Sequence, residues 1–226
     1  MNILALDCAV TRISLAVKTD SKFISSTYDI GMRQSEILVP SIDELLQKAE
    51  LSPAELNATV LTIGPGSFTG LRLGISALKA IELAYNVPVY GVSSLEAYAY
   101  PYKNFELPVL SCIDANKDKF YSRITDDDKI LLNDDDYEIS KIEEAVKSFD
   151  TLLICGPDAK KLYEKLQSTY NEKRFLLPAA FAQTAESLIH IAEKMISTGV
   201  EPLKDFDGPV YLRASEAELK LNGTIS

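Results

Sequence analysis

Short apolar runs alternate with amphipathic stretches along most of the chain, which is the pattern of mixed sheets flanked by helices. The apolar runs predict strands at residues 2–6, 13–17, 58–63, 87–90, 108–113, 120–124, 151–155 and 209–213. Apolar residues spaced three and four apart predict helices at 35–50, 71–85, 94–100, 141–147, from Gly156-Pro157-Asp158 to about Thr169, and at 182–198. The sequence therefore predicts an α/β protein.

Two similar hairpins open the two halves of the chain. In each, an apolar strand ends at an aspartate, Asp7 or Asp114, and a second strand returns after a short turn. Segments 6–9 and 113–116 align as a strand end, an Asp and a turn, a weak internal repeat that indicates a duplicated domain. We place the boundary in the link at 101–107. The predicted domains are 1–104 and 105–226, with the last residues packing back on the first domain.

The loop from Gly64 to Gly70, Gly-Pro-Gly-Ser-Phe-Thr-Gly, joins a predicted strand to a predicted helix. Such a junction presents backbone N–H groups at the positive end of a helix dipole. The loop has neither the Lys-Ser/Thr pair of a Walker A motif nor the glycine spacing of a dinucleotide fingerprint. Two interpretations stay open: a tight turn capped by Ser67 or Thr69, and a contact for an anion or nucleotide. The candidate contacts are Gly64, Gly66, Ser67, Thr69, Asp7 and Asp114.

The helix that follows this loop has more than one apolar face. Small residues recur on one side, and larger apolar residues lie on another. A single sheet covers only one face of a helix. A neighbouring helix of the same chain or another subunit must cover the second face, and both alternatives stay open. The predicted partner interface, on this helix and on the helix at 35–50, comprises Leu38, Ile42, Gly70, Gly74, Ala77, Leu78 and Ile81.

Asp7 and Asp114 are the strongest candidates for a chemical role. Each ends the first strand of its half, so both should approach the cleft between the domains, where two carboxylates could hold Mg²⁺ and a nucleotide. The alternative is that each caps a turn by accepting hydrogen bonds from backbone N–H groups. His190, the only histidine, lies on the polar face of its predicted helix. It supports neither a two-histidine zinc site nor a Ser-His-Asp arrangement, so we predict no catalytic residue and no metal.

Composition and charge narrow the partners. The chain has 226 residues, a net charge of −10 and an isoelectric point near 4.7, so it is a poor RNA binder by itself. The acidic run at 126–136 has no glycine and predicts a solvated hairpin rather than a Ca²⁺ loop. The odd set Cys8, Cys112 and Cys155 predicts reduced, buried thiols. No signal peptide or membrane-spanning stretch is expected, and we predict a cytoplasmic protein without a cofactor.

Several segments together resemble the TsaB family, also called YeaZ, over nearly the whole chain. The loop 64–72 is the most specific of them. The supporting segments are Ile-Leu-Ala-Leu-Asp at 3–7, Ser-Glu-Ile-Leu at 35–38, Ile-Asp-Glu-Leu-Leu at 42–46, Gly-Val-Ser-Ser-Leu at 91–95, Ile-Asp-Ala at 113–115 and Pro-Val-Tyr-Leu-Arg at 209–213. The chain departs from many relatives at Gln34, where they have His, and at Asn116, where they have Arg. These departures put shared polar contacts at the interface or cleft in doubt.

The resemblance implies two duplicated ribonuclease-H-like domains of the actin-like ATPase and sugar kinase superfamily. It also implies a non-catalytic scaffold that pairs through N-terminal helices with a TsaD-like threonylcarbamoyl transferase, with a TsaE-like ATPase joining them. The complex makes N6-threonylcarbamoyladenosine in tRNA at the adenosine following the anticodon. We expect a homodimer when the chain is alone, tRNA contact only through the complex and no enzyme activity. The alternatives are a nucleotide-binding ATPase or kinase using Asp7 and Asp114, and a glycoprotease-type peptidase.

Overall fold

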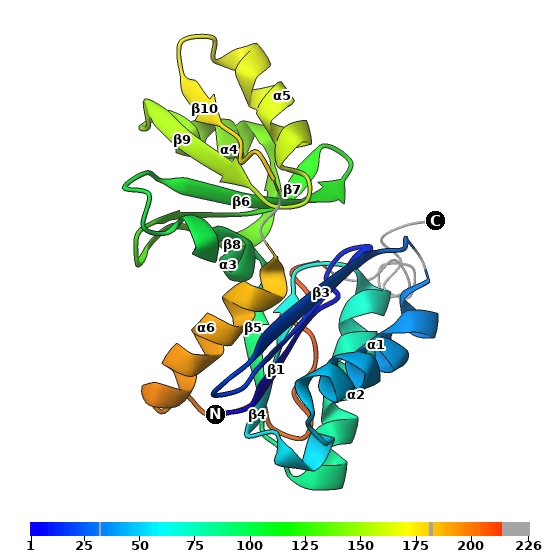
Figure 1. The fold of residues 1–226 in the computed structure, drawn as a ribbon. Helices are drawn as coiled ribbons and strands as arrows, with labels where there is room; N and C mark the ends of the chain where they lie inside the picture. The colour runs from blue at the N-terminus through cyan, green and yellow to red at the C-terminus, as the bar shows by residue number, and fades with distance from the viewer. Residues whose placement is uncertain (32, 181–182, 214–226) are drawn as a thin grey trace, which may run out of the picture.

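Two five-stranded sheets form the two lobes of the molecule (Figure 1). The structure is a computed structural model that describes residues 1–31, 33–180 and 183–213. Among these residues, no helix has both the length and the apolar character needed to cross a membrane. The α/β class predicted from the sequence is confirmed.

The first unit is built on a sheet of order β3-β2-β1-β4-β5. Its strands are β1 (Ile3–Asp7), β2 (Arg12–Lys18), β3 (Phe23–Asp29), β4 (Ala58–Gly64) and β5 (Val89–Ser93). The first three strands are antiparallel, whereas β4 and β5 run parallel to β1. Helices α1 (Gln34–Ala49) and α2 (Phe68–Tyr85) share one hydrophobic core on one face of this sheet, and a short 3-10 helix, Pro53–Glu55, lies between α1 and β4.

The second unit repeats this order as β8-β7-β6-β9-β10. Its strands are β6 (Val109–Asn116), β7 (Lys119–Asp126), β8 (Lys129–Glu138), β9 (Thr151–Cys155) and β10 (Arg174–Leu176), with the same pattern of antiparallel and parallel pairs. Helices α4 (Ile139–Val146) and α5 (Ala159–Thr169) share one core with the second sheet. The two units have the same sequence of elements, so the weak repeat read from the two hairpins reflects a duplicated architecture.

Strand β1 shows why helices cover both faces of the first sheet. All five of its residues are buried. Side chains alternate between the two faces of a strand, so Leu4 and Leu6 enter the core under α1 and α2, whereas Ile3 and Ala5 enter the core under α6 (Thr184–Ser197). Helix α6 thus lies on the first sheet although it follows the second in the chain, as Figure 1 shows in orange.

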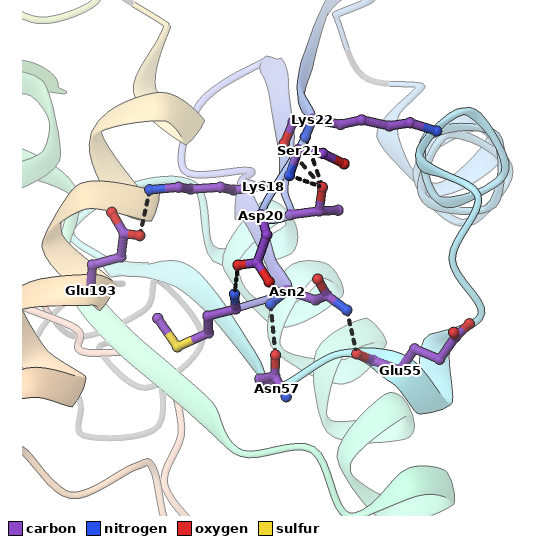
Figure 2. Close-up of polar contacts among 10 residues, drawn as sticks. Asn2, Lys18, Asp20, Ser21, Lys22, Glu55, Asn57 and Glu193 are labelled. Atoms are coloured by element: carbon purple, nitrogen blue, oxygen red, sulfur yellow. Dashed lines mark hydrogen bonds and ion pairs between the residues drawn. The ribbon is translucent and has the colours of Figure 1, made fainter.

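Polar contacts fix α6 and the chain start to the same sheet. The Nζ atom of Lys18 on β2 lies 2.5 Å from Oε1 of Glu193 on α6 (Figure 2). Nearby, the Asn2 N–H donates to Asn57 Oδ1 at 2.7 Å, and the Asn2 side-chain amide donates to Glu55 O at 2.9 Å. We predicted that only the last residues of the chain pack back on the first unit. In the structure, the chain returns to the first unit earlier, at α6.

Helix α3 (Ser94–Ala99) lies where the two units meet. Ala97 belongs to the core under α6, whereas Leu95 and Tyr98 pack with Ile113 of the second sheet. A 3-10 turn, Tyr100–Tyr102, and residues 103–108 then lead into β6. The predicted link at 101–107 lies in this connection.

Several predicted elements differ from the structure. Strands β3 and β10 were not predicted, and β8 was predicted only as part of the acidic hairpin. The predicted strand at 209–213 is wrong, because that segment is irregular and contributes the backbone bond from Val210 N–H to Ile63 O at 2.7 Å. Helix α2 starts at Phe68 rather than at 71. Helix α6 starts at Thr184, and residue 182 of its predicted range lies outside the described residues.

Candidate functional site

A cleft of about 1600 Å³ lies between the two units. Asp7 and Asp114 both line it, as the repeat of the two hairpins predicted, and Gly66, Ser67 and Thr69 of the loop before α2 line it too. Gly64 is not among its lining residues, because it packs against the backbone of Val210 instead. The cleft therefore collects most of the candidate contacts, and their surroundings decide what each one can do.

Asp7 is nearly inaccessible, with 3% of its surface exposed. Its Oδ1 accepts hydrogen bonds from Ala9 N–H at 2.9 Å and from the Thr62 hydroxyl at 2.7 Å, and its Oδ2 accepts one from the Tyr98 hydroxyl at 3.4 Å. Burial raises the pKa of Asp7 above its ordinary value, and the hydrogen bonds from Ala9 and Thr62 oppose this shift. The carboxyl group thus joins β1, β4 and α3.

Asp114 is more accessible and differently paired. Its Oδ1 accepts the Asn116 N–H at 3.0 Å, and its Oδ2 forms a short ion pair with Nζ of Lys161 on α5. Its own backbone N–H donates to Asp158 Oδ2 at 2.8 Å. Burial raises the pKa of Asp158, and the negative charge of Asp114 adds to that rise. A cation from the protein itself therefore balances the charge of Asp114.

The two aspartates share one local role. Asp7 bonds the N–H of Ala9, and Asp114 bonds the N–H of Asn116, so each carboxylate closes a turn two residues further on. This is the turn-capping alternative that the sequence left open. Among the described residues, no three His, Cys, Asp or Glu side chains gather in a group that could hold a metal ion.

The loop before α2 also takes the structural alternative. Ser67 is the N-cap of α2 and accepts the Gly70 N–H at 3.3 Å, and its own N–H donates to Ala9 O at 2.7 Å. A Cβ atom at Gly66 would lie 2.3 Å from Ala9 O. A side chain at Gly66 would collide with the β1–β2 turn. Glycine therefore allows the loop to pack closely against the turn that Asp7 caps.

Most of the predicted partner interface is core. Leu38, Leu78, Gly70 and Gly74 are buried inside the first unit, and a Cβ atom at Gly70 would lie 2.1 Å from Cys8 O. Ile42 is 7% exposed. The intrachain alternative therefore holds at these five positions, and their contact with a partner stays a prediction. Ala77 and Ile81 are partly buried and pack against the same core.

Other predicted features have mixed outcomes. His190 is exposed, with 53% of its side chain accessible, and its ring stacks on Tyr100 with centroids 6.3 Å apart. Cys8, Cys112 and Cys155 are buried, free thiols, as predicted. The acidic run does form the β7–β8 hairpin, but it is not wholly solvated, because Asp134 is largely buried and pairs with Arg123 at 3.1 Å.

The two departures from the family pattern contact or lie in the hairpin turns. Gln34 is buried, and its side-chain amide donates to Val10 O in the β1–β2 turn. Asn116 is exposed, lines the cleft and has a φ of 62° in the β6–β7 turn. Both residues thus serve the hairpins that carry Asp7 and Asp114.

Sequence reasoning missed the partners of both aspartates. Thr62, Tyr98, Asp158 and Lys161 come from other elements, and their spacing from the aspartates carries no local pattern. One signal was available: a Gly-Pro dipeptide stands at the end of β4, at Gly64-Pro65, and directly after β9, at Gly156-Pro157. Both of these glycines have a positive φ, 127° and 102°. Aligning these dipeptides would have extended the repeat to Asp158 and to α5.

Comparisons with known proteins agree with this architecture. A family profile described as TsaD, tRNA N6-adenosine threonylcarbamoyltransferase, matches residues 31–206. The chain is 27% identical over 228 residues to the tRNA threonylcarbamoyladenosine biosynthesis protein TsaB of Bacillus subtilis, and the match covers 97% of each chain. The solved structure of YeaZ from Pseudomonas aeruginosa superposes with a TM-score of 0.79 at 22% identity, covering 93% of this chain and 99% of that one.

A more distant similarity places the fold. An inorganic polyphosphate/ATP-glucomannokinase from Arthrobacter matches with a TM-score of 0.54 at 13% identity, over 85% of this chain and 99% of that one. The glucomannokinase therefore shares the fold of this chain, in agreement with the kinase-like fold that the resemblance implied.

Proposed function

Since the chain belongs to the TsaB (YeaZ) family, in the wider family of the transferase TsaD, we propose that it serves tRNA threonylcarbamoyladenosine biosynthesis as a non-catalytic partner subunit. Its partner is a TsaD-like transferase, and a TsaE-like ATPase joins the pair. The chain contacts tRNA only through this complex, forms a homodimer when alone and works in the cytoplasm. The modified base is the adenosine following the anticodon.

The observation that carries the non-catalytic role is the engagement of both cleft carboxylates. Catalytic carboxylates must reach a substrate, a metal or a water. Asp7 is buried and bonded by Ala9, Thr62 and Tyr98, and Asp114 is bonded by Asn116 and neutralised by Lys161. Each has a complete structural role, so we infer that neither performs chemistry.

The exposed side of α1 and α2 supports the pairing role. The core-facing positions of these helices are filled, but Val39 on α1 is 62% exposed, and Leu83 and Tyr85 on α2 are 91% and 48% exposed. In the second unit, the exposed positions of α4 and α5 carry charge, as in the pairs Lys141–Glu144 and Lys160–Glu164. We therefore move the proposed contact from the small-residue stripe to the outer surface around Val39 and Leu83.

Leu83 offers the sharpest test of pairing. Its side chain is 91% exposed, so Leu83→Glu should leave the fold intact and place a charge in the proposed contact. We would co-express each variant with the cognate TsaD-like protein and measure the complex by size-exclusion chromatography. The expected result is at least a tenfold loss of complex, about 1.4 kcal/mol.

A matched control separates the surface from the charge. Ser140→Glu adds the same charge at an exposed position of α4, in the second unit. It should leave complex formation unchanged. Complex formation by Leu83→Glu at the level of Ser140→Glu would contradict the proposed surface, and no complex with the unaltered chain would contradict the proposed partner.

A nucleotide-binding ATPase or kinase is the second candidate, favoured by one observation. The cleft of about 1600 Å³ is large enough for a nucleotide, and both aspartates line it. This candidate predicts that Mg²⁺ and ATP bind the isolated chain and that Asp7→Asn abolishes turnover. The partner-subunit proposal predicts that the unaltered chain and the Asp7→Asn variant both turn over ATP no faster than background.

A further inference from the structure

Residues 203–213, which we name the strap, follow α6 and lie along the first unit. The strap begins at β5, where the Leu203 N–H donates to Val89 O at 2.7 Å. Lys79 on α2 donates to Leu203 O at 3.2 Å and to Lys204 O at 2.9 Å. Further on, the Val210 N–H donates to Ile63 O on β4 at 2.7 Å. Backbone bonds thus hold the strap at both ends of its path over the first unit.

Close approach at glycines holds the strap against the sheet. A Cβ atom at Gly64 would lie 2.3 Å from Val210 O, and one at Gly91 would lie 3.1 Å from Leu203 Cδ2. Only a residue without a side chain lets the strap pass over β4 at Gly64, whose φ of 127° also favours glycine. The strap is therefore a packed part of the first unit.

Tyr211 joins the strap to the first turn of α2. Its ring stacks on Phe68 with centroids 4.6 Å apart and an interplanar angle of 27°. Its hydroxyl accepts a hydrogen bond from Arg72 Nε at 2.8 Å, and the Arg72 guanidinium lies 5.5 Å from the ring centroid. Phe68 and Arg72 both line the cleft, so the strap reaches the cleft at this point.

Arg213 carries the strap across to the second unit. Its Nη1 donates to Ala115 O at 3.0 Å, next to Asp114, and its Nε lies 4.0 Å from Asp136 Oδ2 on β8. Only 13% of the Asp136 side chain is exposed, and its Oδ1 is buried with no hydrogen-bond partner among the described residues. A carboxylate this buried needs a compensating cation, and Arg213 is placed to supply it.

We propose that the strap is a clasp that sets the opening of the interdomain cleft, with Tyr211 anchoring it on the first unit and Arg213 holding the second. Other contacts between the units include the chain links, the packing of α3 on the second sheet, the hydrogen bond from Ser93 to Asp134 and the exposed Lys194–Asp128 ion pair. A clasp from β4 to the β6–β7 turn restrains rotation about those connections. Releasing Arg213 lets the second unit move away and widens the cleft. This inference does not depend on the proposed function.

Distance measurements between the units test the clasp. Cysteines at Ala54 in the first unit and Ser168 in the second would carry spin labels, because both positions are exposed and the three natural thiols are buried. We expect Arg213→Gln to shift the label-to-label distance distribution to longer values and to broaden it. Arg213→Lys, which keeps a charge beside Asp136 but loses the guanidinium fork, should give a smaller shift.

The controls make the result decisive. Arg174→Gln removes the same charge from an exposed position of β10 and should leave the distribution unchanged. Tyr211→Ala removes the anchor and should reproduce the broadening of Arg213→Gln. A distribution for Arg213→Gln that matches Arg174→Gln would overturn the clasp. If thermal melts show that Arg213→Gln is unfolded, the distance distributions of Arg213→Lys and Tyr211→Ala test the clasp instead. Unshifted distributions in both variants would overturn the clasp.

Discussion

The two units share an order of strands but differ at the corresponding aspartates. Asp7 and Asp114 cap equivalent turns, yet Asp7 is buried among Thr62 and Tyr98, whereas Asp114 is balanced by a lysine that is 52% exposed. Both units thus use an aspartate to cap the turn after their first strand, but the residues around that aspartate differ between the units. An aspartate at the end of the first strand is therefore evidence for this hairpin before it is evidence for catalysis.

The outer helices differ in the same way. Helices α1 and α2 expose Val39 and Leu83 in addition to charged pairs such as Glu44–Lys48, whereas the exposed pairs of α4 and α5 are charged. A charged outer surface suits contact with water, and an apolar one suits contact with another protein. Under the proposed pairing, a duplicated scaffold keeps its core pattern while only one copy offers an apolar outer surface.

The largest expected effect comes from the glycines that end β4 and β9. At Gly156 the φ is 102°, and a Cβ atom would lie 2.3 Å from Cys112 O. Gly156→Ala should therefore lower the free energy of unfolding by about 3 kcal/mol or more, because strain and a backbone clash add. Gly64→Ala should behave alike, with its clash at Val210 O. Denaturant unfolding measures both.

Gly199 supplies the matched control. Its φ is 73°, but nothing lies within 4 Å of the position of a Cβ atom. Gly199→Ala should cost only the left-handed strain, about 1 kcal/mol. Equal losses for Gly199→Ala and Gly156→Ala would show that the close approach in the second unit contributes nothing.

A smaller effect should reveal the burial of Asp7 through the pH dependence of stability. Burial raises the folded-state pKa of Asp7 above its ordinary value of 3.8, so the folded state holds this proton more tightly than the unfolded state. The neutral Asp7 carboxyl therefore makes its full contribution to the free energy of unfolding below about pH 3.8. This contribution is lost as the pH rises through the folded-state pKa of Asp7. The unfolding free energy of Asp7→Asn minus that of the unaltered chain should rise with pH in this window, by at most about 1.4 kcal/mol per pH unit.

The measurement is denaturant unfolding at a series of pH values from 3 to about 8. Asp7→Asn is compared with the unaltered chain at each pH value. A flat difference for Asp7→Asn would mean that Asp7 titrates as an exposed carboxyl does.

The smallest expected effect is at the ion pair of the second unit. The Lys161 side chain is 52% exposed, so solvent screens its pair with Asp114. Lys161→Met should change the free energy of unfolding by no more than about 1 kcal/mol. A loss of several kcal/mol would show that the second aspartate is held as tightly as the first.

Local patterns allowed most of this architecture to be predicted. The strands that lie in the middle of each sheet were found because they are continuous apolar runs, such as β1 and β6. The edge strand β5 was also predicted, because it begins with an apolar run. The edge strands β3 and β8 lack such a pattern, because β3 contains Ser-Ser-Thr and β8 contains three consecutive aspartates, so partners in the sheet define them. β10 has three residues and shows no periodicity.

The site could be predicted only in part. The matching hairpins placed Asp7 and Asp114 at the cleft, but the choice between chemistry and turn capping depended on Thr62, Tyr98 and Lys161, which come from distant segments. The small-residue stripe of α2 indicated close packing correctly but did not identify what packs there. Gly70 and Gly74 approach the chain's own β1 region, at Cys8 and Leu6. Spacing alone does not distinguish a neighbouring sheet from a partner.

The most direct test of the non-catalytic role is the rate of tRNA threonylcarbamoyladenosine formation by a reconstituted complex. It would contain this chain, its TsaD-like transferase and its TsaE-like ATPase, supplied with tRNA and a threonylcarbamoyl donor. We expect the double variant Asp7→Asn, Asp114→Asn to support the reaction at the unaltered rate, and Leu83→Glu to lose at least tenfold at subsaturating concentration. A double variant that is folded, pairs normally and yet abolishes the reaction would contradict the account.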